Sequence, residues 1–204
     1  MAERGCFVRA VAMVAAVAAW MGVPGRSQAA EPKELLAAFL KEPTKESYLR
    51  LFEAVTSAPS YNPYSRDLDE ATDLMSAKKH REAQEKLEKA MPNLLLSPRA
   101  HQFASIAAKG LGDDKKAESE RDTAAACLKG ILLTGDGSGE RPYLVTRVSD
   151  EYDLLRHLKK GKKAQSLRQK DGKSYDVMSC ADGSEVWFDI TAMFGQLRKG
   201  FEKK

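Results

Sequence analysis

Residues 174–191, SYDVMSCADGSEVWFDIT, decide the fold class of this 204-residue chain. Apolar and polar residues alternate on both sides of Ala181-Asp182-Gly183-Ser184, as in two antiparallel strands joined by a tight turn. Asp171-Gly172 marks a further turn, so residues 165–170 can supply a third strand. The stretch therefore predicts a small antiparallel β-sheet of two or three strands near the C-terminus.

Apolar residues at helical spacing surround this hairpin. Met193, Phe194 and Leu197 predict a C-terminal helix, and residues 150–158 predict another helix before the sheet. Residues 34–132 are typical of one helix after another. The expected class is α+β, with helical hairpins first, then the small antiparallel sheet, and a closing helix.

Two alanines of the upstream helices recur at a fixed spacing, which indicates an internal repeat. Ala83 and Ala90 recur 34 residues later as Ala117 and Ala124. This period is typical of tetratricopeptide repeats, in which small residues let paired helices approach closely. Only two units are visible, whereas stacked arrays usually need three or more. We therefore expect tetratricopeptide-like antiparallel hairpins over residues 31–134, capped by the remainder of the chain.

The first thirty residues have the parts of a secretory signal peptide. Two arginines precede residues 10–23, which carry no charge, and Ser27-Gln28-Ala29 places small residues at a cleavage site. The uncharged run has 14 residues, whereas a membrane span needs about 20. We expect residues 1–30 to be removed, leaving residues 31–204 as a single domain whose cap spans residues 140–204. The mature protein is expected in the periplasm or outside the cell, with no transmembrane segment.

Charge and architecture bear on the class of partner. The first thirty residues contribute half of the formal net charge of +4, so the mature chain is only weakly basic. The lysine cluster from Lys159 to Lys163 is typical of a solvated loop. We therefore expect no nucleic-acid partner. A protein or peptide held in the helical groove is the partner that paired hairpins predict.

Signals for catalysis are missing from the sequence. It contains no G-x-S-x-G, H-E-x-x-H, phosphate-binding glycine loop or Cys-x-x-Cys. His80, His101 and His157 stand apart and are expected at the surface. Cys127 and Cys180 form an even pair that invites a disulfide after export, and two buried free thiols are the alternative. We predict no catalytic residue, metal ligand or cofactor.

The richest chemistry belongs to aromatic and acidic residues. Carboxylates beside tyrosines can bind a sugar or peptide, and two carboxylates at a suitable separation can perform acid–base hydrolysis. In the alternative interpretation, the tyrosines belong to the core, while Asp176 and Asp189 point outward from the strands. The candidate binding residues are expected to meet around the turn at Asp136, joining the helices to the sheet: Tyr61, Tyr64, Asp136, Glu151 and Tyr152.

Several short motifs carry a family resemblance. They are Tyr61-Asn62-Pro63-Tyr64, Gly135-Asp136-Gly137, Asp150-Glu151-Tyr152, and Asp171 to Val177 leading into Phe188-Asp189-Ile190. In this order they make residues 46–198 similar to an uncharacterised family of exported bacterial proteins, described as a domain of unknown function. The resemblance implies an exported, repeat-like helical domain with a terminal β-sheet, and it implies no activity.

Two functional hypotheses follow. The leading one is an exported, non-catalytic binding or scaffolding module of the cell envelope. The alternative is a hydrolase-like enzyme or small-ligand binder that uses the Asp/Glu/Tyr set. The positions of four side chains distinguish the two hypotheses: Tyr64, Asp136, Glu151 and Tyr152. If they meet in one concave pocket, the enzyme or small-ligand binder is favoured. If they lie apart, the non-catalytic binding module is favoured.

Overall fold

The computed structural model describes Met1 and residues 31–202, with no side-chain description beyond residue 197. Apart from Met1, the predicted signal peptide lies outside the described residues. Within the described part, no helix combines the length and the apolar character needed to cross a membrane. This part contains eight helices and one sheet of four strands, which confirms the α+β class.

Six helices come first, and consecutive ones pack together as α1 with α2 and as the series α3 to α6. Side chains at their starts define several of the boundaries. The Thr44 hydroxyl accepts a hydrogen bond from the Ser47 amide at 3.1 Å, and Ser97 and Asp113 cap α5 and α6 in the same way. The helices are α1 Pro32–Lys41, α2 Lys45–Ser57, α3 Asp67–Ser76, α4 His80–Leu94, α5 Pro98–Gly110 and α6 Asp114–Thr134.

Small residues line the contacts among α4, α5 and α6. Ala83 of α4 and Ala117 of α6, which occupy equivalent positions of the 34-residue repeat, are both buried. Between them, α5 buries Ala100, Ala104 and Ala107. A face of alanines lets neighbouring helices approach closely, because no long side chain separates their backbones.

The rest of the chain forms the cap. The sheet order is β1-β4-β3-β2, and β1 pairs in parallel with β4 while the other pairs are antiparallel. The sheet is therefore mixed and has one strand more than predicted, because a two-residue strand is too short to show alternation. The elements are β1 Tyr143–Leu144, α7 Val148–His157, β2 Lys162–Lys170, β3 Lys173–Cys180, β4 Glu185–Asp189 and α8 Thr191–Glu202.

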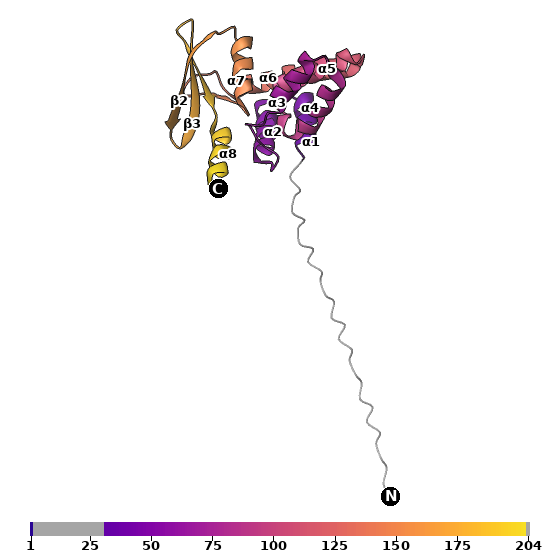
Figure 1. The fold of residues 1–204 in the computed structure, drawn as a ribbon. Coiled ribbons are helices and arrows are strands. Elements are labelled where there is room, and N and C mark those ends of the chain that lie inside the picture. Colours follow the sequence, from indigo (N-terminus) through magenta and orange to yellow (C-terminus); the bar gives the residue numbers. More distant parts are fainter. Residues whose placement is uncertain (2–30, 203–204) are drawn as a thin grey trace.

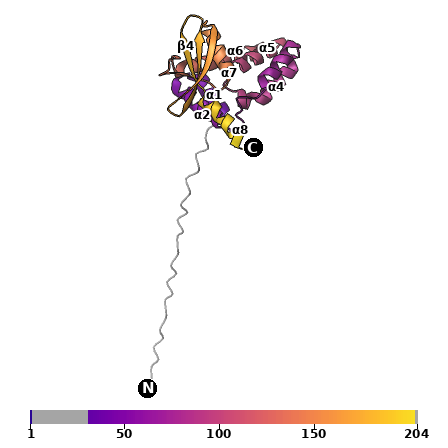
Figure 2. The same cartoon turned by 60° about the vertical axis from the view of Figure 1, so that its left-hand side comes forward.

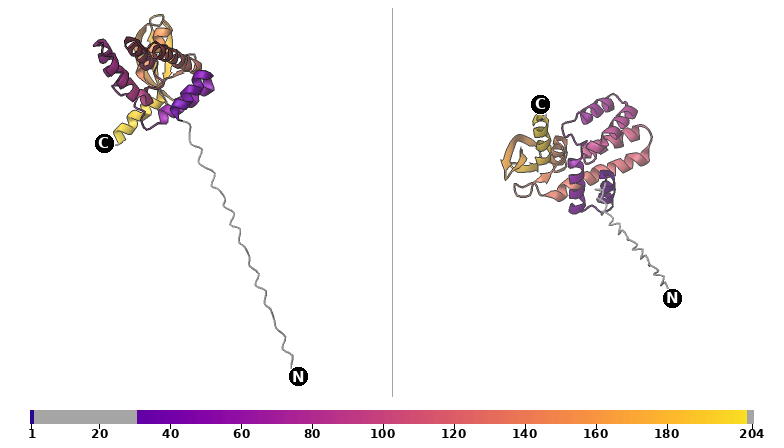
Figure 3. Two further views of the ribbon diagram at one scale, coloured as in Figure 1. Left: turned by 90° about the vertical axis from the view of Figure 1, so that its right-hand side faces the viewer. Right: turned by 90° about the horizontal axis from the view of Figure 1, so that it is seen from below.

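The helices and the cap share one apolar core. Figure 1 shows the sheet at one end of the molecule, α4 and α5 at the other, and α6 and α7 between them. Figure 2 and Figure 3 show that α8 projects beside the sheet, away from α5. Buried side chains from both parts meet in one cluster, including Tyr48, Ile131, Leu154 and Phe188. The helices α3 to α5 enclose a second, smaller apolar cluster, which includes Leu87 and Ala104.

The outer edge of the sheet is basic and uncovered. β2 occupies this edge, and all nine of its residues are exposed. Lys162, Lys163, Arg168 and Lys170 are spread along it. Charged side chains on an edge strand oppose pairing with a strand of another molecule.

Candidate functional site

A buried polar cluster joins the helices to the cap at the start of α7. Arg147 is 3% exposed and donates to the Asn93 carbonyl oxygen at 2.9 Å and to the Asn93 side-chain oxygen at 3.3 Å. Asp150 accepts from the amide and the hydroxyl of Thr146 at 3.1 and 2.8 Å. The Tyr61 hydroxyl donates to the Thr146 carbonyl at 2.7 Å. These bonds connect the end of α4 and the Tyr61 loop to α7.

Burial dominates the protonation of this cluster. It raises the pKa of Asp150 to about 6, although the Arg147 charge and the Thr146 hydrogen bonds oppose the rise. It also lowers the pKa of Arg147 and raises that of Tyr61. Because the Arg147 and Asp150 charges stabilise each other in the interior, removing either one would leave the other uncompensated. The cluster therefore connects the helical part to the cap through buried charges and hydrogen bonds.

Glu151, the next residue of α7, has an unusual environment for a carboxyl group. It is completely buried, and no donor in the described part of the chain reaches either of its side-chain oxygens. It faces Asp176 of β3, and the two acids are close enough for their charges to interact. Burial raises the pKa of Glu151 to about 9, and the charges of Asp176 and Asp150 add to the rise. Glu151 therefore keeps its proton at neutral pH.

The position of Asp176 corrects the expectation that it points outward. Asp176 lies opposite Phe188 in the β3–β4 ladder, so the two side chains share the sheet face that contacts α7. Its carboxylate also accepts from the Gln165 amide at 2.8 Å, and burial raises its pKa. Asp189, on the opposite face, is 5% exposed and therefore also buried. Because β3 is covered on both faces, alternation along the sequence could not identify the inner one.

Tyr64 and Tyr152 lie at the margin of this acid pair. Tyr64 is 47% exposed, and its hydroxyl donates to the Met193 carbonyl at 3.3 Å. Burial of the hydroxyl raises its pKa, and the charges of Asp176 and Glu151 add to this effect. Lys162 donates to the Tyr152 hydroxyl at 2.6 Å. Four of the predicted residues thus lie in or beside α7: Glu151 and Tyr152 belong to it, and Tyr61 and Tyr64 lie next to it.

Asp136, the predicted centre of the cluster, makes its hydrogen bonds elsewhere. Its carboxylate accepts from the Ser138 amide at 3.0 Å and pairs with Arg141, both within its own turn. These hydrogen bonds and the Arg141 charge hold the pKa of Asp136 below its usual range. The turn instead covers the sheet, since the Gly137 carbonyl accepts from the Trp187 amide at 2.9 Å. Asp136 is therefore a local turn residue, bonded to none of the other four.

The acid pair is closed to solvent, since Glu151 is completely buried and Asp176 is 8% exposed. None of the four best-formed cavities among the described residues is lined by Glu151 or Asp176. Nor do the described residues include a group of three or more His, Cys, Asp or Glu able to hold a metal ion. The acid pair therefore lies in the interior, outside these four cavities.

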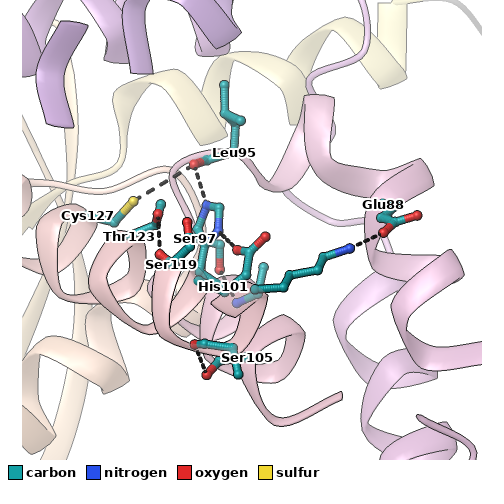
Figure 4. A network of polar contacts seen from close by, with 12 residues as sticks. Glu88, Leu95, Ser97, His101, Ser105, Ser119, Thr123 and Cys127 are labelled. Atoms are coloured by element: carbon teal, nitrogen blue, oxygen red, sulfur yellow. Dashed lines mark hydrogen bonds and ion pairs between the residues drawn. The ribbon is translucent and has the colours of Figure 1, made fainter. Parts of the chain in front are cut away.

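A second buried network centres on His101 (Figure 4). Its Nδ1 lies 2.6 Å from Glu120 Oε2, and its Nε2 lies 3.0 Å from the Leu95 carbonyl oxygen. The ionised carboxylate and the carbonyl only accept, so both ring nitrogens donate and the imidazole is positively charged. Burial lowers the pKa of His101, but the interactions with nearby Cys127 and with Glu120, together with the hydrogen bond to the Leu95 carbonyl, outweigh it and raise the pKa to about 10.

The surface position predicted for His101 is wrong, since only 4% of the residue is exposed. A signal was present in the sequence, because His101 shares helical spacing with Ser97, Ala104 and Ala108 on the buried face of α5. Its partners Glu120 and Cys127 come from α6, and only the packing of the two helices brings them to the ring.

Cys127, His101 and Glu120 have the residue types of a nucleophile, a base and an orienting acid. Their hydrogen bonds prevent that role in this arrangement. His101 Nε2 donates to Leu95 and cannot accept the thiol proton, and the Cys127 thiol points to the same carbonyl at 3.9 Å. Cys127 is also completely buried, and both it and Cys180 are free thiols in this structure, so the candidate disulfide is not formed.

The best-formed cleft lies between α5, α6 and α7 and has a volume of about 460 Å³. Arg121 of α6 and Arg156 of α7 border it, with side chains 68% and 70% exposed. Asp153, which also borders it, is nearly buried and lies 2.6 Å from Arg99. Most of the remaining lining is apolar: Pro98, Ile106, Ala124, Ala125 and Leu128. We name this cleft the α5–α7 groove; it can hold an apolar segment between two cationic edges.

Comparison with known proteins places the chain in a family. Residues 40–199 match the family described as Domain of unknown function (DUF4919). No curated protein and no solved structure matches the chain. The match includes the Tyr61 loop, the α5–α7 groove, the acid pair and the sheet. The chain therefore belongs to the DUF4919 family.

Proposed function

We propose that this protein is an exported, non-catalytic binding module of the bacterial cell envelope. It holds a segment of a partner protein in the α5–α7 groove, on a scaffold of tetratricopeptide-like hairpins. The groove is the observation that carries the proposal, because it gathers partly exposed apolar side chains in one cleft. Ile106 is 47% exposed at its floor. Apolar surface gathered in a cleft is typical of a docking site.

The organisation around the groove supports binding rather than catalysis. The acids of the cluster at α7 and the Cys127 thiol of the His101 network lie outside the groove lining. The buried alanines Ala83 and Ala117 stand where tetratricopeptide packing would require small residues. A rigid hairpin surface with an open cleft suits the recognition of a partner segment.

A site-specific crosslinking experiment tests the binding role. A photoreactive residue replaces Ile106 in the groove, and a matched control carries it at Leu111, which is also exposed but lies outside the groove. We expect a defined adduct from position 106 in cells and none from position 111. The adduct's partner should bind the purified protein, and Ile106→Asp should abolish that binding. Equal labelling from both positions would contradict the proposal.

Export is tested separately. The charged start, the uncharged run and Ala29 in the first thirty residues support it. N-terminal sequencing of protein from the envelope fraction should begin at Ala30 or Glu31. Cytoplasmic protein that retains an intact Met1 would contradict the localisation and leave the groove proposal standing.

A further inference from the structure

We infer that the α5–α7 groove recognises an acidic amphipathic helix of a partner protein. This inference rests on the proposed function and specifies the chemistry of the ligand. The apolar side of the ligand helix would cover Ile106 and Leu128. Its carboxylates would lie against Arg121 on one edge and Arg156 on the other.

The charges at the groove favour an acidic ligand. Asp153 is the only carboxylate in the lining, and it is engaged by Arg99 at 2.6 Å and by Arg156 at 3.0 Å. The lining therefore contains two arginines, Arg121 and Arg156, against this one carboxylate. Glu118 and Asp122 lie outside the lining, and their contacts to Arg121 are long and exposed, at 3.4 and 3.7 Å. Exposed contacts of this kind are weak and can be exchanged for carboxylates of a ligand.

The shape of the groove favours a helix over an extended strand. Its floor is built from residues at helical spacing on α5 and α6, and such surfaces receive a third helix by interdigitation of side chains. Ala124 and Ala125 are short, so a ligand backbone can approach α6 closely. No strand residue lines the groove, so a ligand could not bind there by adding a strand to the sheet.

Three labelled 18-residue helical peptides provide the test, with binding measured by fluorescence anisotropy. The first has leucines on one face and glutamates flanking them, the second has lysines in place of the glutamates, and the third has serines in place of the leucines. We expect only the first to bind. Arg121→Gln with Arg156→Gln should weaken its binding about tenfold, because two exposed ion pairs are lost. The control Arg50→Gln removes an exposed arginine of α2 outside the groove and should change nothing.

The outcomes separate this inference from the proposed function. If Ile106→Asp abolishes binding but the acidic and basic peptides bind equally, the acidic ligand is refuted and the groove remains a docking site. If no peptide binds, the acidic helix is refuted, and crosslinking from position 106 decides separately whether the groove is a docking site. If the first peptide binds Ile106→Asp as well as the wild type, it does not occupy the groove and the inference is refuted likewise. Sedimentation with phosphatidylglycerol vesicles that depends on Arg121 and Arg156, without peptide binding, would assign the groove to a membrane surface and refute the peptide ligand.

Discussion

Replacing Glu151 with glutamine should stabilise the protein at pH 8 and change it little at pH 5. Glu151 is buried against Asp176 and has a folded-state pKa of about 9, against an ordinary value of 4.5. Between these values the folded state holds a proton that the unfolded state has released. Stability therefore falls as pH rises through this interval, since the unfolded state binds fewer protons. Glutamine has nearly the same shape as glutamate and takes up no proton in this interval.

The expected size follows from the two pKa values. One unit of difference corresponds to about 1.4 kcal/mol, so Glu151 removes about 3 kcal/mol of stability between pH 4.5 and pH 7. Asp150, raised to about 6, acts in the same direction over a narrower range. His101 does so too: its stabilisation is complete below its unfolded pKa of 6.5 and is lost as pH approaches 10. The wild type should therefore be more stable near pH 5 than near pH 8.

Urea unfolding followed by circular dichroism at pH 5, 6, 7 and 8 measures this effect. The matched control is Glu140→Gln, which removes an exposed carboxylate from the turn before β1. The free energy of unfolding of Glu151→Gln should depend less on pH than that of the wild type, by up to about 1.4 kcal/mol per pH unit. Glu140→Gln should retain the wild-type slope. Equal slopes for the wild type and Glu151→Gln would refute the buried, protonated state of Glu151.

Three further substitutions test packing. His101→Phe should lower the free energy of unfolding by about 2–4 kcal/mol because buried acceptors lose their donors, whereas the exposed His157→Phe should not. Ala83→Leu should cost about 1–3 kcal/mol by overpacking, and the exposed Ala37→Leu should melt like the wild type. Gly137→Ala should cost about 1–3 kcal/mol, because its φ of +77° is left-handed and a Cβ would approach the Tyr143 ring to 2.6 Å. Denaturant melts measure all three, and unchanged midpoints would contradict these contacts.

Much of the fold could be predicted from local patterns. The Asp182-Gly183 turn between alternating segments located the β3–β4 hairpin, and apolar spacing located α7 and α8. The parallel pairing of β1 with β4 was not predictable, since two residues carry no periodic signal. The sequence also does not show which face of β3 points toward α7. Asp176 lies on that face, and Tyr175 and Val177 on the opposite face are buried as well.

The candidate site was predicted less completely. Four of the five predicted residues lie in or beside α7, namely Tyr61, Tyr64, Glu151 and Tyr152. Asp136 instead bonds within its own turn. Short polar side chains next to glycines suit local turns as well as binding sites, and the sequence does not distinguish them. The α5–α7 groove was expected only as a general feature of paired hairpins. Its lining depends on how α7 packs against α5 and α6, which is a tertiary contact.

The bonds from Arg147 to Asn93 and from Tyr61 to Thr146 limit how this chain can evolve. Open-ended repeat proteins lengthen by duplicating a unit, since each unit contacts only its neighbours. Here Asn93, in the last turn of α4, is bonded to Arg147 at the start of α7, so a unit inserted between these helices would have to preserve this contact. Additional hairpins are therefore accommodated most easily outside this junction, and other variation falls on the exposed surfaces.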